Sequence, residues 1–224
     1  MRARARWCAA AFVVSGCLPK NTPDAPVFSV TEPTGLAWDV GPHPMRELTV
    51  RVEHGDDVRI GEWSWELIPS EASAEVQLTP HDGDVVRFVG FPDGESRAPA
   101  TDFTQHVLRS TLWITLPNRP VTLGESWDDP QWVEPFLGLM PAGTADRVHG
   151  RSELVSLVRR ETQTEAVIDS IASVSFQGRT VIEAQARGVF RVTTGELLSR
   201  EVTARFYTPT GPDTLRIAVS QPGG

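Results

Sequence analysis

The chain has 224 residues, 40% of them hydrophobic, and a formal net charge of −8. This length and composition suffice for one ordinary domain with a packed core of its own. The excess of acidic residues argues against nucleic-acid binding, because phosphate groups require a basic surface.

The first 16 residues have the composition of a signal peptide. Arg2, Arg4 and Arg6 precede an apolar run from Trp7 to Val14, which is the order of charged and apolar regions in a secretory leader. The run is much shorter than the roughly 20 apolar residues that a membrane-spanning helix needs. We therefore expect residues 1–16 to be removed and the remainder of the chain to be exported.

The end of this leader, Val14-Ser15-Gly16-Cys17, resembles the lipobox of bacterial lipoproteins. The resemblance implies cleavage before Cys17, attachment of a diacylglyceryl group to its thiol, and anchoring to a membrane through acyl chains. Leu18 stands where an Asp retains enterobacterial lipoproteins at the inner membrane, so the resemblance favours the outer membrane. The alternative is an ordinary secretory leader that ends beside an unrelated cysteine.

Cleavage would also change the cysteine content and the charge of the mature chain. Cys8 would be lost with the leader and Cys17 would carry lipid, which leaves no cysteine for a disulfide bond. Loss of three arginines leaves 18 basic and 29 acidic residues and a net charge of −11. This charge is suited to a soluble body held away from an anionic membrane surface.

Residues 17–35 comprise the lipidated cysteine and a proline-rich tether, because proline favours extended backbone and removes hydrogen-bond donors. The body, residues 36–224, then shows the two-residue alternation of half-buried strands. Its first half is expected to contain strands separated by turns at 53–57 and 81–84, where Gly and Asp cluster. These strands are placed around Leu48–Val52 and at 61–69, 74–80 and 85–91.

The middle of the chain interrupts this pattern. Residues 104–116 are compatible with either a helix or a strand, and no segment is convincingly helical. Residues 117–143 are rich in proline and have no clear period, which predicts an irregular connection between two possible β lobes, 36–116 and 144–224.

The second half alternates most clearly. In residues 182–192 the even positions are apolar or small and most odd positions are polar. A turn at Gly195 and a continuing alternation through Phe206 predict a hairpin, and further strands are expected before Gly178 and around Ile217.

These patterns predict an all-β fold with long antiparallel strands in a curved sheet, either an incomplete barrel or a barrel-like sandwich, with little helix. Strands of about 13 residues are expected to coil rather than stay flat. With the segment LPNRPVTLGESWDD at 116–129, the strand pattern is loosely similar to the half-barrel lipid-handling lipoproteins of the cell envelope. No catalytic or binding residue is implied by this likeness.

The sequence carries no catalytic or metal-binding motif, so we expect neither an enzyme nor a cofactor. His54 with Asp56 and Asp57, and His81 with Asp82 and Asp84, are the possible metal groups, but both lie in turns where such residues are common. Ser126 in GESWD lacks the second glycine of a nucleophile elbow. The adjacent Asp128 and Asp129 are more typical of a solvated loop than of acid–base chemistry.

Four tryptophans are the candidate ligand-binding residues: Trp63, Trp65, Trp127 and Trp132. Trp63 and Trp65 share one face of a strand and are suited to a ligand cavity or to the core. Trp127 and Trp132 flank an apolar segment that is suited to cover one mouth of a curved sheet. The hypotheses are a non-enzymatic lipoprotein that binds an apolar ligand or an envelope partner, an assembly module without a small ligand, or a hydrolase without a sequence motif.

Overall fold

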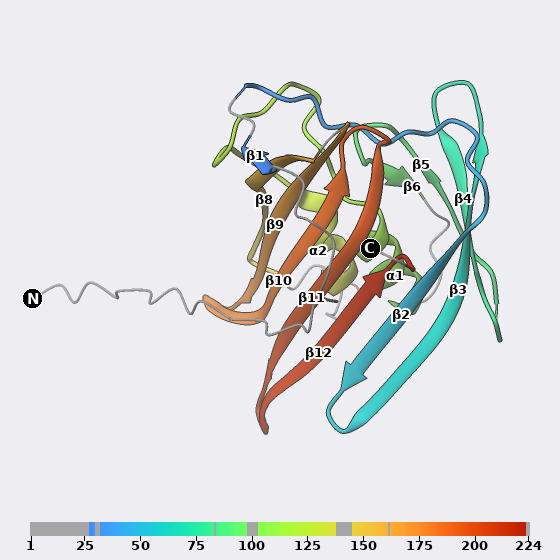
Figure 1. The fold of residues 1–224 in the computed structure, drawn as a ribbon. Helices are drawn as coiled ribbons and strands as arrows, with labels where there is room; N and C mark the ends of the chain where they lie inside the picture. The colour runs from blue at the N-terminus through green and yellow to red at the C-terminus, as the bar shows by residue number, and fades with distance from the viewer. Residues whose placement is uncertain are drawn as a thin grey trace, which may run out of the picture.

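The fold is a single curved antiparallel sheet with two short helices in its concavity (Figure 1). The computed structural model describes residues 27–29, 32–82, 84–97, 103–137, 145–160 and 162–222. The signal peptide and Cys17 lie outside the described residues. The all-β prediction and the curved, unclosed sheet are confirmed.

Eleven strands form one continuous ladder, and a short twelfth strand pairs beside it with β8. The order is β1-β8-β9-β10-β11-β12-β2-β3-β4-β5-β6. The first group of strands is β1 Val27–Ser29, β2 Arg46–His54, β3 Asp57–Pro69, β4 Ala74–Pro80, β5 Val86–Gly90, β6 Ser96–Arg97 and β7 Ser126–Asp128. The second group is β8 Arg147–Arg160, β9 Gln163–Phe176, β10 Arg179–Arg191, β11 Glu196–Thr208 and β12 Gly211–Ser220.

The last strand of the chain pairs with the first long strand. Ile217 of β12 lies opposite Val52 of β2, and the ladder runs from Leu215–His54 to Ser220–Thr49. The stretches 36–116 and 144–224 therefore contribute to one sheet and share a core.

The alternation in the sequence corresponds to the two faces of this sheet. On β10 the even residues from Ile182 to Phe190 face the interior, while Arg187 on the outer face donates to Asp169 of β9 through Nε at 2.7 Å and Nη2 at 2.6 Å. Many inward residues on β9–β11 are small, and a Cβ at Gly188 would lie 3.0 Å from Ile114 Cδ1. Small inner side chains thus leave room for helices inside the curve.

Two helices occupy that space, and the expectation of little helix is confirmed. The first lies mainly within residues 104–116, for which a helix and a strand were both possible from the sequence, whereas the second was not expected. Helix α1, Phe103–Leu112, packs against β11 and β12, and α2, Pro130–Leu137, packs against β8 and β9. In α1 the hydroxyls of Ser110 and Thr111 donate to the Val107 carbonyl oxygen, so these polar side chains can be buried.

The expectation of an irregular connection at 117–143 needs correction at two places, since β7 and α2 lie within it. Helix α2 begins with an N-cap: Asp129 Oδ1 accepts a hydrogen bond from the Trp132 backbone N–H at 3.2 Å, and Pro130 occupies the first helical position. Both are established helix-start signals. The irregular pattern of apolar residues in this short helix concealed it.

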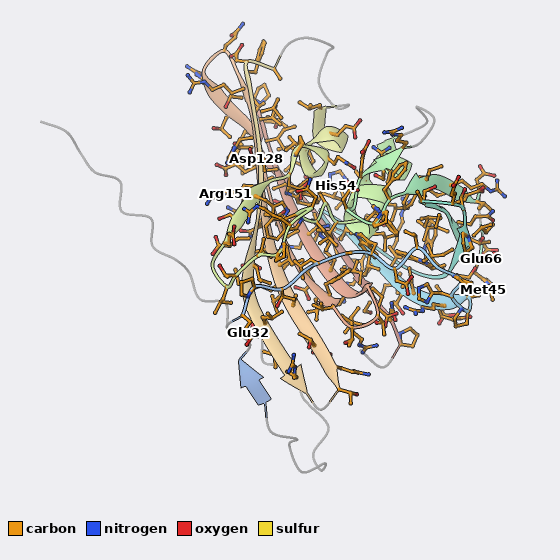
Figure 2. The ribbon with its side chains drawn as sticks, turned by 90° about the horizontal axis from the view of Figure 1, so that it is seen from above. Glu32, Met45, His54, Glu66, Asp128 and Arg151 are labelled. Atoms are coloured by element: carbon orange, nitrogen blue, oxygen red, sulfur yellow. The ribbon has the colours of Figure 1, made fainter. Side chains whose placement is uncertain are left out.

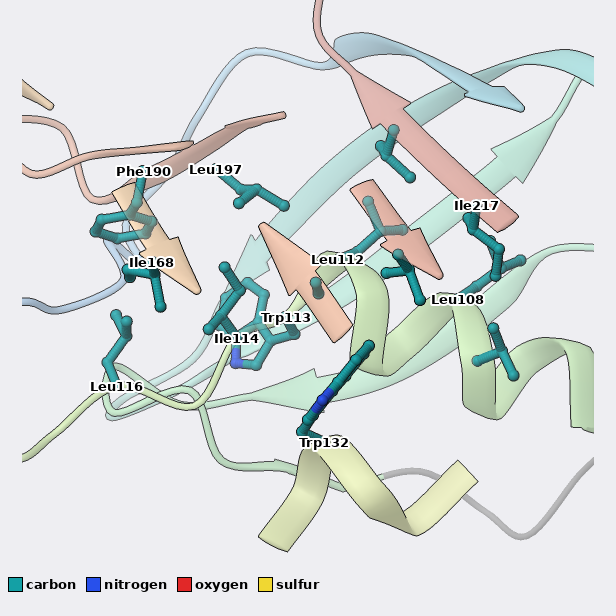
Figure 3. Packing of buried hydrophobic residues seen from close by; sticks show 14 of the residues in the cluster. Leu108, Leu112, Trp113, Ile114, Leu116, Trp132, Ile168, Phe190, Leu197 and Ile217 are labelled. Atoms are coloured by element: carbon teal, nitrogen blue, oxygen red, sulfur yellow. The ribbon is translucent and has the colours of Figure 1, made fainter. Parts of the chain in front are cut away.

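Residues 32–45 cross one end of the curved sheet. The backbone N–H of Trp38 donates to the Pro92 carbonyl and that of Asp39 to the Gly195 carbonyl, which connects the β5–β6 and β10–β11 turns. The Trp38 side chain enters the core and packs against Trp113, Trp65 and Phe190. Figure 3 shows Trp113 and Phe190 among the surrounding aliphatic residues of this core. This end of the sheet is thereby closed.

Candidate functional site

At the opposite end, the concave face opens into a cavity of about 820 Å³. Its floor consists of three adjacent strands in register, β12, β2 and β3. The facing rows are Val219–Val50–Gly61, Ile217–Val52–Arg59 and Leu215–His54–Asp57. Each strand changes from buried apolar to accessible polar residues in the same direction, toward the turns at the lower end of Figure 1.

Helix α1 supplies the opposite wall of the cavity through Val107 and Leu108. Trp63 lines the cavity where it meets the core. Gly61 also lines it, and a Cβ at this position would lie 3.2 Å from Trp63 Nε1. The absence of a side chain at Gly61 therefore leaves space beside the Trp63 ring.

Charged residues surround the open end. His54 Nε2 lies 2.7 Å from Asp213 Oδ2, which connects the tips of the β2–β3 and β11–β12 hairpins. Arg59 donates to Asp57 Oδ2 through Nε at 3.0 Å and Nη2 at 2.8 Å. The hydrogen bond from His54 lowers the pKa of the Asp213 carboxyl. Seen from above in Figure 2, His54 lies toward the middle of the molecule, whereas Glu66 lies near its margin.

The four candidate tryptophans have different surroundings. Only Trp63 lines the cavity. Trp65 is buried, with its ring centroid 6.2 Å from that of Trp38 and 6.1 Å from that of Trp113. Trp132 is buried beneath Arg200, and Trp127 is half-buried and donates through Nε1 to the Thr115 carbonyl at 3.0 Å. Trp65 and Trp132 therefore belong to the core rather than to the cavity.

A buried polar chain that the sequence reasoning missed fixes both helices inside the sheet. Arg200 donates to the Ser110 carbonyl of α1 at 3.0 Å, and its guanidinium lies 4.6 Å from the centre of the Trp132 ring of α2. Its Nη2 also donates to Ser170 at 3.3 Å. Arg200 lies on the same inward face of β11 as the even-numbered residues Val202 and Ala204. The alternation in the sequence therefore already indicated an inward-facing charge.

This chain of hydrogen bonds ends at a buried carboxylate. Ser152 donates to Asp129 Oδ2 at 2.7 Å and lies 2.8 Å from Ser170 Oγ. Because the Ser152 hydroxyl is used by Asp129, Ser170 donates to Ser152 and accepts from Arg200. Burial lowers the pKa of Arg200 to about 10, while the attraction of Asp129 opposes that shift. The network joins β11, β9, β8 and the start of α2.

The other candidate residues lie at separate places in the fold. Ser126 accepts a hydrogen bond from Arg151, Asp128 is exposed, and Asp129 belongs to the buried network. His54 and His81 lie at the cavity rim. Across the described ranges, no three His, Cys, Asp or Glu side chains are grouped closely enough to hold a metal ion. Neither of the described helices is long and apolar enough to span a membrane.

Comparison of the chain with protein-family models, with curated proteins and with solved structures gives no match.

Proposed function

We propose that this chain is a non-enzymatic lipoprotein of the cell envelope that binds an apolar ligand between β12, β2, β3 and α1. The observation that carries the proposal is the cavity of about 820 Å³, whose floor is apolar at Val50, Val52, Leu215 and Ile217 and becomes polar only toward its open end. Its volume is within the range of about 300–1,000 Å³ that is usual for small-molecule sites. The lipobox at Val14-Ser15-Gly16-Cys17 supports anchoring at the envelope.

The arrangement of the core explains why a ligand would bind at this end. Trp38, Trp65 and Trp113 fill the other end of the concavity, and the Arg200 network holds α1 and α2 in place. Hydrocarbon can therefore enter only where the rows of apolar residues reach solvent. Transfer of apolar surface from water to these walls would supply about 25 cal/mol per Å² before the costs of association.

Binding can be measured with N-phenyl-1-naphthylamine, a neutral probe that fluoresces in apolar surroundings. We would use the full chain carrying Cys17→Ala, so that neither its own acyl chains nor detergent competes. Val52→Trp fills the floor of the cavity, whereas Arg51→Trp places the same ring on the outer face of β2. We expect Val52→Trp to weaken probe binding by about tenfold or more and Arg51→Trp to have little effect.

A second cavity variant, Leu215→Trp, covers the possibility that Val52→Trp does not fold, and circular dichroism checks each variant. Absence of probe binding to the unsubstituted cavity, or equal binding by folded cavity and outer-face variants, would contradict the proposal. Native mass spectrometry of protein extracted from its own envelope should also detect a bound apolar molecule.

A second candidate function, docking of an envelope partner, is favoured by the free edge of β3. Strand β4 pairs with β3 only from Trp63 onward, and the His81 backbone N–H donates to the Glu62 carbonyl. Among the described residues the stretch 57–61 therefore has a ladder partner on the β2 side alone. Val58 and Ile60 are exposed along it. Such an edge can accept an added strand. A photo-crosslinker at position 58 should then capture a partner in cells, and Ile60→Lys should reduce that yield.

A further inference from the structure

We propose that the cavity selects single-chain amphiphiles with a cationic head group over those with an anionic head group. This inference rests on the proposed function, because it specifies the class of apolar ligand that the same cavity binds. It commits to an alkylammonium type of amphiphile, with its hydrocarbon tail on the apolar rows and its head at the rim.

The orientation of a bound amphiphile follows from the change in burial and polarity along three neighbouring strands. Val50 and Ile217 are buried, Val52 and Leu215 are half-buried, and His54 is exposed at the end of the same face. An apolar chain therefore contacts apolar residues along its length only when it points toward Trp63 and α1. The polar end of the ligand must then lie among the charged residues of the hairpin tips.

The charges at the rim favour a cation there. Asp57 and Asp82 are the acidic residues on the cavity side of the rim, and Arg59 is the basic residue beside them. Glu62 has the same strand parity as Glu66, so its carboxylate lies on the outer face of β3. The Arg59 guanidinium is held by two hydrogen bonds to Asp57, so these two charges offset each other. His54 Nε2 lies 2.7 Å from Asp213 Oδ2.

The Asp82 carboxylate remains without such a counter-charge. No ion pair of Asp82 occurs within the described part of the chain. A negative head group would therefore meet net negative charge, whereas an ammonium group would be attracted. The rim is exposed to solvent, so the discrimination should be moderate, about tenfold, and should weaken as salt screens the charges.

The experiment is displacement of bound N-phenyl-1-naphthylamine by three ligands with the same twelve-carbon chain. Dodecylammonium, dodecanol and dodecanoate differ in head-group charge but not in tail length. At about pH 8 and low salt, where carboxylates and the ammonium group are ionised, we expect dodecylammonium to displace the probe at about one-tenth of the concentration needed with dodecanoate. Dodecanol should lie between them, and the difference should shrink in high salt.

Isosteric variants at the rim test whether its carboxylates cause the preference for the ammonium ligand. Asp82→Asn removes an unpaired carboxylate, and Asp57→Asn frees the Arg59 cation, so each should reduce the preference for the ammonium ligand. Glu66→Gln removes one negative charge from the outer face of β3 and should leave the preference unchanged.

The two levels of the proposal fail in different ways. Binding of all three ligands with equal affinity, or tighter binding of dodecanoate, overturns the charge selection while the proposed apolar site stands. If Glu66→Gln reduces the preference for the ammonium ligand as much as Asp82→Asn does, the charge selection by the rim is also overturned. The preference would then arise from the net charge of the whole protein. Absence of binding by the probe and by all three ligands overturns the proposed function itself.

Discussion

The indole rings of Trp38 and Trp113 stack with their centroids 4.1 Å apart and their planes inclined by 10°. Trp38 also donates through Nε1 to the Ile114 carbonyl at 2.8 Å. One residue comes from the segment that crosses the end of the sheet and the other directly follows α1. Their contact therefore joins the closed end of the sheet to the element that forms one wall of the cavity.

Substitution Trp38→Ala should destabilise the protein by about 3–5 kcal/mol, since it removes a buried aromatic side chain and leaves a cavity in the core. The Ile114 carbonyl would also lose its donor. Urea denaturation measures the change in the free energy of unfolding. Trp63→Ala is the control, because Trp63 is only half-buried and its loss should cost clearly less. Equal losses would contradict the assignment of Trp38 to the closed end.

The buried network predicts coupling between Arg200 and Asp129. Arg200→Met should cost about 3–5 kcal/mol, because it leaves Asp129 buried without its compensating charge. Asp129→Asn removes the negative charge of Asp129 itself but retains a side chain able to cap α2. In a double-mutant cycle, the combined variant should be more stable than the sum of the single effects by about 1 kcal/mol or more. Additive effects would show that the two charges do not interact.

The His54–Asp213 pair predicts an unusual titration of Asp213. Its folded-state pKa is lowered, chiefly by the hydrogen bond from His54. The resulting stabilisation is therefore present above the ordinary carboxyl pKa of about 3.9 and is lost as pH falls through the lower folded value. Carbon-13 NMR of the carboxyl should record this low pKa, and His54→Ala should raise it toward the ordinary value. An unchanged titration in that variant would contradict the contact.

Gly150 should resist enlargement because α2 packs directly over it. A Cβ at this position would lie 2.2 Å from the Asp129 carbonyl oxygen and 2.6 Å from Val133 Cγ2. We expect Gly150→Ala to cost about 1–3 kcal/mol by forcing α2 away from β8. Gly35→Ala is the matched control, since a Cβ there meets no atom within 4 Å. A neutral Gly150→Ala in thermal denaturation would show that α2 does not lie against β8.

The lipobox predicts the behaviour of Cys17→Ala in cells. Without the thiol no acyl chain can be attached at this position. We expect the variant to move from the membrane fraction to the soluble periplasmic fraction and to lose labelling by radioactive palmitate. Membrane association equal to that of the unsubstituted protein would mean that another contact holds it there.

The sequence was sufficient to predict a curved all-β fold, because the alternation along β9–β12 is a local property of each strand. The leader and Cys17 were likewise assigned by local order and spacing, and that assignment stays a prediction. Helix α2 was missed although Asp129 and Pro130 provide a local start signal, because the following eight residues are too few to establish a clear period.

Only the tertiary structure decided which inward-facing residues form the core and which form the cavity. Trp63 and Trp65 share a face of β3, yet Trp65 packs against Trp38 and Trp113 while Trp63 borders open space. That difference depends on the pairing of β12 with β2 and on the position of α1, both of which connect distant parts of the chain. Alternation specifies the face of a strand on which a side chain lies, whereas long-range packing determines what covers that face.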